Sequence, residues 1–203
     1  MLKRYIGLAT LVVFILSLLS FAFSGSPMTK NEALDYVTKI KSHQHTPGGQ
    51  HDLKAVTEFF LSDDGKPFYT VNLYKYHETA NYQQSRNEHI TGQQAYDKFS
   101  KAMIKLLFSN YAYPIFASNW LVQSDKSWDR IIIVRYPNRR AMAKIFADER
   151  FSAASEHKWA SIAEHDRFIV QATHIPELGL IMTLLISLLL VVYLSVKKRK
   201  KVH

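Results

Sequence analysis

Two uncharged, apolar runs bracket the chain and dominate its pattern of hydrophobic and polar positions. They span Tyr5–Phe23 and Leu178–Val196. A helix of about 19 residues at about 1.5 Å per residue just crosses a hydrocarbon core about 30 Å thick, so both runs are predicted to be transmembrane helices. Basic residues precede the first run and follow the second. Because basic flanks stay cytoplasmic, we expect a bacterial inner (cell) membrane protein with both ends inside and the intervening segment extracytoplasmic.

The first run has a second interpretation as a cleaved signal peptide. Ala22 and Ser24 occupy the small-x-small positions of a cleavage site before Gly25. The run is longer than a typical signal-peptide core, which favours an uncleaved anchor. The segment that follows is extracytoplasmic under either interpretation.

Between the runs, the pattern changes to short amphipathic and alternating segments. Helices are predicted at 29–41, beginning with a Thr29/Glu32 capping box, and at 52–61. The aromatic and β-branched stretch Phe68–Tyr76 predicts a strand. A helix capped by Thr91 and Gln94 and a hairpin of strands at 113–123 and 128–136 are predicted next. They are followed by a helix capped by Asn138, a further helical turn with Trp159, Ile162 and Ala163, and a last strand at 167–174.

From Phe68 onward the predicted order is β-α-β-β-α-β, which indicates an α+β fold of the ferredoxin-like kind. Two helices would cover one face of a four-stranded antiparallel sheet. Large apolar residues alternate on both sides of the strands, so a second copy of the sheet is expected to cover the other face in a homodimer. The predicted divisions are an anchor at 1–24, a helical, His-rich lead-in at 25–66, the α+β domain at 67–176, a transmembrane helix at 177–196 and a basic cytoplasmic tail at 197–203.

The net charge of +9 at first suggests a nucleic-acid partner, but the charge is unevenly placed. Seven of the 26 basic residues flank the apolar runs, and the segment between them carries 19 basic against 17 acidic residues. A segment so close to neutral has no strong field for phosphates, so nucleic-acid binding is not expected, whereas the basic tail suits contact with the lipid bilayer. The chain has no cysteine, which excludes disulfides and thiolate chemistry.

Several short motifs resemble those of the dimeric α+β barrel superfamily. They are Val71–Tyr76, Trp128–Asp129–Arg130, Val134–Arg139 and the turn from His157 to Ala163. Within that superfamily, the chain is similar over about 52–174 to the uncharacterised bacterial family called domain of unknown function 1330. The resemblance implies a barrel-like dimer and, as relatives of this kind include cofactor-independent oxygenases and isomerases, a possible small-molecule site. The two membrane spans and the His-rich loop depart from the family pattern.

Alternation along the first strand separates Asn72 and Tyr74 from Val71 and Leu73. The apolar side is expected to lie beneath the helices, which would direct Asn72 and Tyr74 into a cavity between two sheets. Arg135 can supply a cation there, and His165 or His174 can supply a titratable group. Such a set suits a small anionic or phenolic ligand. The alternative is structural: Asn72 bonds a neighbouring loop, and Arg135 pairs with an acidic residue at the rim.

Candidate metal and haem sites are less complete, because each lacks part of the ligand set or motif that such a site needs. His43, His45 and His51 form a loop cluster with some metal-ligand spacing, although no carboxylate shares it. His157 is a candidate axial haem ligand without a supporting motif. No nucleophile elbow, phosphate loop or dinucleotide motif occurs, so no cofactor is expected. The sequence thus predicts a membrane-anchored small-molecule binding or assembly module, with a cofactor-independent oxygenase or isomerase as the alternative.

Overall fold

The computed structural model describes residues 25–43, 51–83, 89–119 and 128–171, together with isolated positions 11, 185, 186, 188, 189, 192 and 193. Ser24–Gln171 forms one compact unit. Nearly all of the apolar runs Tyr5–Phe23 and Leu178–Val196 lies outside the described residues. Among the residues that are described, no helix combines the length and the apolar character needed to cross a membrane.

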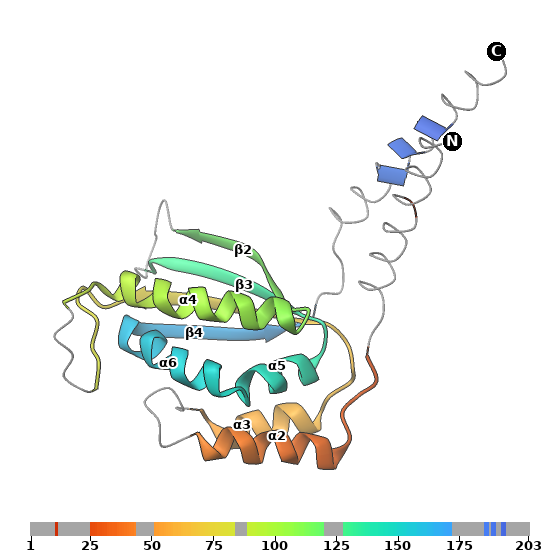
Figure 1. Ribbon diagram of the computed structural model, residues 1–203, viewed down its shortest axis with the longest axis horizontal. Coiled ribbons are helices and arrows are strands. Elements are labelled where there is room, and N and C mark those ends of the chain that lie inside the picture. The colour runs from red at the N-terminus through yellow and green to blue at the C-terminus, as the bar shows by residue number, and fades with distance from the viewer. Residues whose placement is uncertain are drawn as a thin grey trace. The chain divides into compact units, whose positions relative to one another are not determined.

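A four-stranded antiparallel sheet organises the compact unit (Figure 1). Its spatial order is β2-β3-β1-β4, formed by β1 (Phe68–Tyr76), β2 (Tyr113–Asn119), β3 (Arg130–Tyr136) and β4 (Ile162–Val170). β1 pairs with both β3 and β4, so the first strand occupies the interior of the sheet. The predicted α+β class and the order of elements from Phe68 onward are confirmed.

Helices lie along one side of this sheet and in a further group beside it. α4 (Gly92–Ser109) connects β1 to β2, and α5 (Arg139–Phe146) and α6 (Glu149–Ser161) connect β3 to β4. α2 (Lys30–Ser42) and α3 (Leu53–Leu61) pack on one another and on α5 (Figure 1). The chain before β1 therefore extends the helical layer rather than the sheet.

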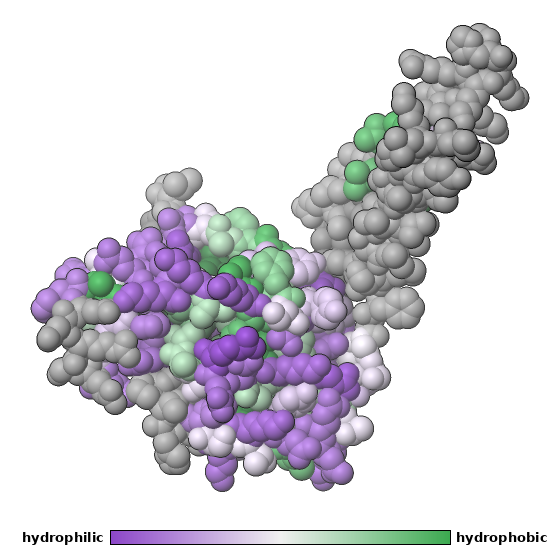
Figure 2. Space-filling model, in the orientation of Figure 1, coloured by the Kyte–Doolittle hydropathy of each residue, from purple (hydrophilic) through white to green (hydrophobic). Residues whose placement is uncertain are grey.

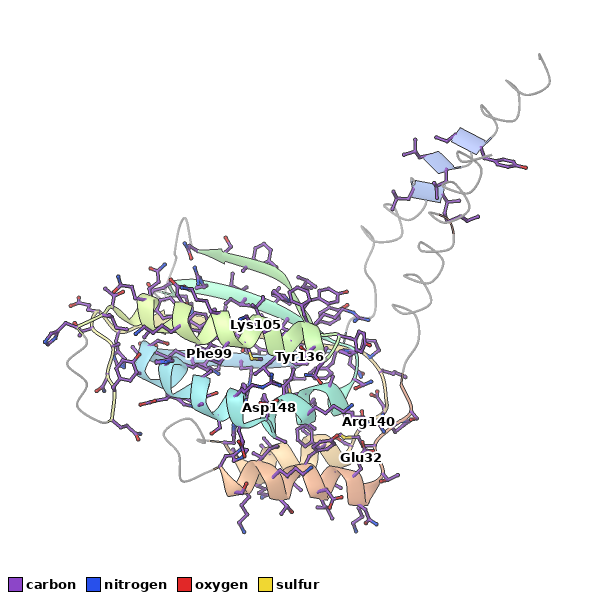
Figure 3. The ribbon with its side chains drawn as sticks, in the orientation of Figure 1. Glu32, Phe99, Lys105, Tyr136, Arg140 and Asp148 are labelled. Carbon is purple, nitrogen blue, oxygen red and sulfur yellow. The ribbon has the colours of Figure 1, made fainter. Side chains whose placement is uncertain are left out.

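Side-chain caps fix where these helices begin. Thr91 and Gln94 form the full capping box predicted for α4, and Asn138 Oδ1 accepts from the backbone N–H of Ala141 at the start of α5. At α2, Thr29 accepts from the N–H of Glu32 as expected, but the Glu32 carboxylate completes no box. It binds Arg140 on α5 instead, with Oε1 2.6 Å from Nε (Figure 3). This ion pair ties α2 to α5.

The last strand differs most from its prediction at 167–174. β4 begins at Ile162, directly after α6, so the predicted helical turn is confirmed for Trp159 and wrong for Ile162 and Ala163. The reason is tertiary, because Tyr76 at the end of β1 pairs with Ile162 across a register shift and draws these residues into the sheet. His174 and positions 120–123 of the predicted second strand lie outside the described residues.

The two faces of β1 are opposite to the sequence prediction. Thr70, Asn72 and Tyr74 are buried, and the Tyr74 ring lies 4.9 Å from the ring of Tyr96 on α4. These even-numbered residues therefore lie beneath the helices, and Val71 and Leu73 lie on the other face, where they are half-buried. The prediction relied on hydropathy alone, whereas the large aromatic rings on this face of the sheet fill the interior better than the shorter apolar side chains.

Aromatic packing joins the helices to the sheet. The rings of Phe68 on β1 and Tyr136 on β3 stack at 5.1 Å, and Phe146 on α5 and Phe151 on α6 stack at 4.9 Å. Phe99 on α4 meets Phe151 edge to face. Figure 3 labels Phe99 and Tyr136, which both point into this interior.

The sheet face turned away from the helices carries a row of apolar side chains. Strand pairing aligns Val71 with Ile133 and Phe168, and Leu73 with Ile131. Phe168 is 53% exposed and Phe116, opposite Ile133 on β2, is 49% exposed. Figure 2 views the molecule from the side of α4 and α6, where hydrophilic side chains cover much of the helical surface and hydrophobic ones gather near the β2 edge of the sheet. We call the face turned away from the helices, formed by Val71, Leu73, Phe116, Ile131, Ile133 and Phe168, the open sheet face.

Candidate functional site

A cavity of about 470 Å³ lies between the helices and the sheet. All the secondary-structure elements from α3 to β4 contribute to its lining, and the exposed residues Ala55, Ile104 and Arg167 belong to it, so it opens to solvent. Most of its surface is apolar. The residues with polar groups in the lining are His51, Asp52, Thr70, Asn72, Tyr74, Tyr96, Ser100, Arg130, Tyr136, Ser155, Lys158, Trp159 and Arg167.

Asn72 and His165 meet at the sheet side of the cavity. The Nδ2 group of Asn72 donates to Thr70 Oγ1 at 3.1 Å and to the carbonyl of Ile132 at 3.3 Å. Its Oδ1 lies 3.3 Å from His165 Nε2. Because an amide oxygen can only accept, His165 carries its proton on Nε2. Asn72 thus holds one defined tautomer of the imidazole and is itself fully bonded.

Tyr74 connects this pair to the helices. Its ring stacks on His165 at 4.7 Å, and its hydroxyl is hydrogen-bonded to Tyr96 on α4. Burial raises the pKa of Tyr74 to about 12, and burial together with the nearby Lys158 and Arg167 charges lowers the pKa of His165 to about 3. At neutral pH the cavity therefore contains a protonated phenol beside an uncharged imidazole.

Arg135, the fourth residue predicted for this site, is not part of it. It pairs with Tyr69 in the register, which puts it on the opposite face of the sheet from Asn72 and Tyr74. Its guanidinium lies 5.7 Å from the Tyr113 ring centroid. The prediction placed Arg135 in the cavity without a register for this strand. In the structure Arg135 is three residues from Ile132, the cross-strand partner of Asn72, so the two side chains lie on opposite faces.

Lys158 on α6 is the functional candidate that the sequence interpretation missed. Its side chain lines the cavity and the residue is only 7% exposed. Its Nζ lies 4.6 Å from the Trp159 ring centroid and 6.0 Å from that of Tyr74. Burial, with a smaller contribution from the charge of Arg167, lowers the pKa of Lys158 to about 7. The signal was present in the sequence, because Lys158 follows Phe151 and Ala154 on the buried stripe of α6.

Positive charge prevails around the cavity. Arg167 lies on β4 directly across from Asn72 and belongs to the lining. The ion pairs formed by the described residues include neither Lys158 nor Arg167. Arg130 is near Asp97, and Asp52, the carboxylate of the lining, caps α3 by accepting from the N–H of Ala55. Lys158 and Arg167 are therefore available to a negatively charged ligand.

Ser155 adds an unusual polar group to the same helix. It lies one turn before Lys158, lines the cavity and is only 1% exposed. Among the groups of the described residues, no hydrogen-bond partner satisfies its Oγ. A buried hydroxyl without a partner is costly, so the most direct role of this group is to bond a molecule in the cavity.

The histidines predicted as weak metal ligands do not form a metal site in the described part of the chain. His51 stacks on Phe146 at 4.9 Å and on Phe151 at 5.8 Å, and burial lowers its pKa to about 4. His43 ends α2, and His45 lies outside the described residues. His157, the haem-ligand candidate, is hydrogen-bonded through Nδ1 to the Tyr82 hydroxyl at 2.7 Å.

Comparison with solved structures finds the same fold in a bacterial protein. The crystal structure of RPA0582, a protein of unknown function from Rhodopseudomonas palustris, matches 62% of this chain and 97% of its own length, with a TM-score of 0.55 and 17% identity. The structure of the methylated RPA0582 protein matches with a TM-score of 0.57 and 18% identity over 63% of this chain. No protein-family model matches the chain. A search of curated proteins also finds no match.

Proposed function

We propose that the chain is a membrane-tethered protein whose α+β domain binds a small anionic molecule with an apolar body. The observation that carries this proposal is the combination of Lys158 and Arg167 in one mainly apolar cavity. A cavity of about 470 Å³ lies within the usual range for small-molecule sites. Arg167 and the protonated fraction of Lys158 favour a carboxylate or a similar anion, and the aromatic lining favours an apolar or aromatic body.

The tether rests on the two apolar runs and their basic flanks. Both runs are long enough to cross a bilayer, and Lys197–Lys201 is a continuous basic segment. We place the domain on the extracytoplasmic side of a bacterial inner membrane and the tail on the cytoplasmic side. The small net charge of the segment between the runs and the absence of cysteine are compatible with this location.

We also propose that the protein forms a homodimer of the dimeric α+β barrel kind through the open sheet face. Support comes from Phe116 and Phe168, which are both about half exposed and lie on that face with Ile131 and Ile133. Contiguous apolar surface of this kind is uncommon on a monomer. An identical sheet related by a two-fold axis covers it symmetrically, and tethering in a membrane raises the local concentration of protomers.

A second candidate function is an enzyme of the cofactor-independent oxygenase or isomerase type. It is favoured by the contact of Tyr74 with His165, which Asn72 holds in one tautomer. A protonated phenol and a neutral imidazole next to a cavity are suitable proton donors and acceptors. Arg135 has no part in this version of the site.

Binding can be tested on the full chain in detergent by thermal unfolding with phenyllactate, an aromatic carboxylate. Saturating ligand should raise Tm, by an amount that corresponds to about 2.7 kcal/mol at 100 times Kd. Arg167→Gln should reduce the Tm rise, because it removes the cation at the cavity opening. Lys105→Met alters an exposed lysine of α4 outside the lining (Figure 3) and should leave the rise unchanged. Equal Tm rises in all three proteins would contradict the proposed site.

A further inference from the structure

We propose that Lys158 forms an imine with the carbonyl group of a 2-oxo acid bound in the cavity. This inference rests on the proposed function and deepens it, because it names both the substrate class and the atom that reacts. The argument depends on three observations: the surroundings of Lys158 Nζ, the position of Arg167, and the polar groups near the site of bond formation.

The surroundings of Lys158 favour a neutral amine. The side chain is buried on the inner stripe of α6, and no carboxylate of the described residues forms an ion pair with it. A structural lysine in such a place normally has an acidic partner, because an isolated buried ammonium is costly. The groups that face Lys158 are Arg167 and His165 from β4, Tyr74 from β1, Tyr96 and Phe99 from α4, and His51 before α3. None of these groups carries a negative charge at neutral pH, and Asp52, the carboxylate of the lining, accepts from the N–H of Ala55 at the start of α3.

Arg167 provides the feature that selects a 2-oxo acid over a simple aldehyde. Its guanidinium lines the cavity from β4, opposite Asn72, and is unpaired among the described ion pairs. A guanidinium binds a carboxylate through two parallel hydrogen bonds. A carboxylate held there leaves the adjacent carbonyl carbon in the cavity that Lys158 also lines, and Arg167 is close enough to Lys158 for its charge to help lower the pKa of that lysine.

The bonds and protons of the step balance without a cofactor. The Nζ lone pair of the neutral amine forms a C–N bond to the carbonyl carbon, and the C=O π electrons move to oxygen. Both amine protons then leave with that oxygen as water, which gives the imine. No oxidation or reduction takes place, and buried lysines with lowered pKa values are suited to this chemistry.

Tyr74 and Ser155 are placed to assist the oxygen that leaves. The Tyr74 ring is 6.0 Å from Lys158 Nζ, and its hydroxyl stays protonated at neutral pH, so it can donate to a developing alkoxide. The Ser155 hydroxyl is buried one turn from Lys158 and has no protein partner among the described residues. We assign Tyr74 as proton donor and Ser155 as a positioning residue.

Reductive trapping provides the test. The full chain in detergent is incubated at pH 7 with phenylpyruvate and cyanoborohydride, which reduces an imine to a stable secondary amine, and the modified peptides are identified by mass spectrometry. We expect Lys158 to be labelled at least about tenfold faster than the exposed Lys105, since a lysine with an ordinary pKa is almost entirely protonated at pH 7. The labelling rate should rise with pH around a midpoint near 7.

Matched variants separate this proposal from the binding proposal. Lys158→Arg should abolish the adduct and Tyr74→Phe should slow its formation, whereas Lys105→Met, outside the lining, should leave both the adduct on Lys158 and the Tm rise with phenyllactate unchanged. Phenyllactate has a hydroxyl in place of the ketone and cannot form the imine, so its Tm rise reports binding alone. A Tm rise with phenyllactate but no adduct on Lys158 would overturn the imine and leave the binding function intact. Absence of both signals would overturn the two proposals together. Labelling of Lys158 at the same rate as Lys105 would also overturn the imine.

Discussion

Replacing the buried Lys158 by methionine should stabilise the protein at neutral pH, because it removes an amine that is costly to bury in its charged form. Methionine has a similar length and lacks the charge. In the folded protein the pKa of Lys158 is lowered from 10.5 to about 7. Each pH unit of that difference corresponds to about 1.4 kcal/mol, so at pH 7 the lysine costs the folded state about 4 kcal/mol relative to the unfolded chain.

Part of this cost is offset by contacts that methionine does not reproduce. The contact of Nζ with the Trp159 ring contributes about 1 kcal/mol, and methionine packing is imperfect. We therefore expect a net stabilisation of about 2 kcal/mol, which corresponds to a Tm increase of about 4–8 °C for a domain of this size. The assay is thermal unfolding of the full chain in detergent, followed by tryptophan fluorescence.

The pH dependence identifies the cause. A lysine with a lowered pKa in the folded state binds fewer protons there than in the unfolded chain between pH 7 and 10.5, so the stability of the wild type rises across this window. The Tm advantage of Lys158→Met should be largest at pH 7 and below, and it should vanish toward pH 10.5. Lys105→Met, at an exposed position of α4, should change Tm little at any pH. A variant less stable than the wild type by the same amount at every pH would refute the reasoning, because it would mean that Lys158 is a paired, structural cation.

Three further predictions follow from other parts of the molecule. His51→Phe should reduce the loss of Tm between pH 6.5 and 4. The pKa of His51 is lowered to about 4 in the folded protein, so in this window the unfolded chain binds the proton more readily and unfolding is favoured as the pH falls. An unchanged loss of Tm would show that His51 is not the group responsible. Ile133→Asp should convert the proposed dimer into monomers in analytical ultracentrifugation, since a carboxylate on the open sheet face cannot be desolvated at an interface; a wild type that is already monomeric would refute the dimer. Reporter fusions within 43–51 and after His203 should give extracytoplasmic and cytoplasmic signals respectively, and a cytoplasmic signal from the loop would refute the topology.

Local signals in the sequence were sufficient to predict individual elements. The stretch Phe68–Tyr76 forms a strand with the predicted ends, and Thr91 and Asn138 cap the helices assigned to them. Each of these features depends on neighbours within a few residues. The start of β4 at Ile162 depends on pairing with Tyr76, far away in the chain, and for that reason it could not be predicted from local propensity.

The site was predicted in part, for a related reason. Asn72, Tyr74 and His165 do meet, because alternation fixes Asn72 and Tyr74 on one face and His165 is the register partner of Tyr74. Which face the helices cover is a tertiary property, and hydropathy gave the wrong answer for β1. The cation beside Asn72 is Arg167 and not Arg135, because Arg167 is the residue of β4 that pairs with Asn72. That register, which shifts after Lys75, is set by strand pairing and cannot be derived from the sequence of β4 alone.

Ligand binding and dimerisation, which the sequence interpretation placed on the same face of the sheet, lie on opposite faces in the structure. A site between two sheets would depend on the dimer, whereas the cavity described here lies between the helices and the sheet of a single chain, with lining residues from His51 to Arg167. Ile133 lies on the open sheet face, whereas Lys158 projects from α6 into the cavity on the opposite side of the sheet. Ile133→Asp should therefore change the oligomeric state without altering the Tm rise produced by phenyllactate. Lys158→Arg should abolish trapping with phenylpyruvate and leave the sedimentation unchanged. If Ile133→Asp leaves the protein folded but removes ligand binding, the cavity would have to depend on the partner's sheet.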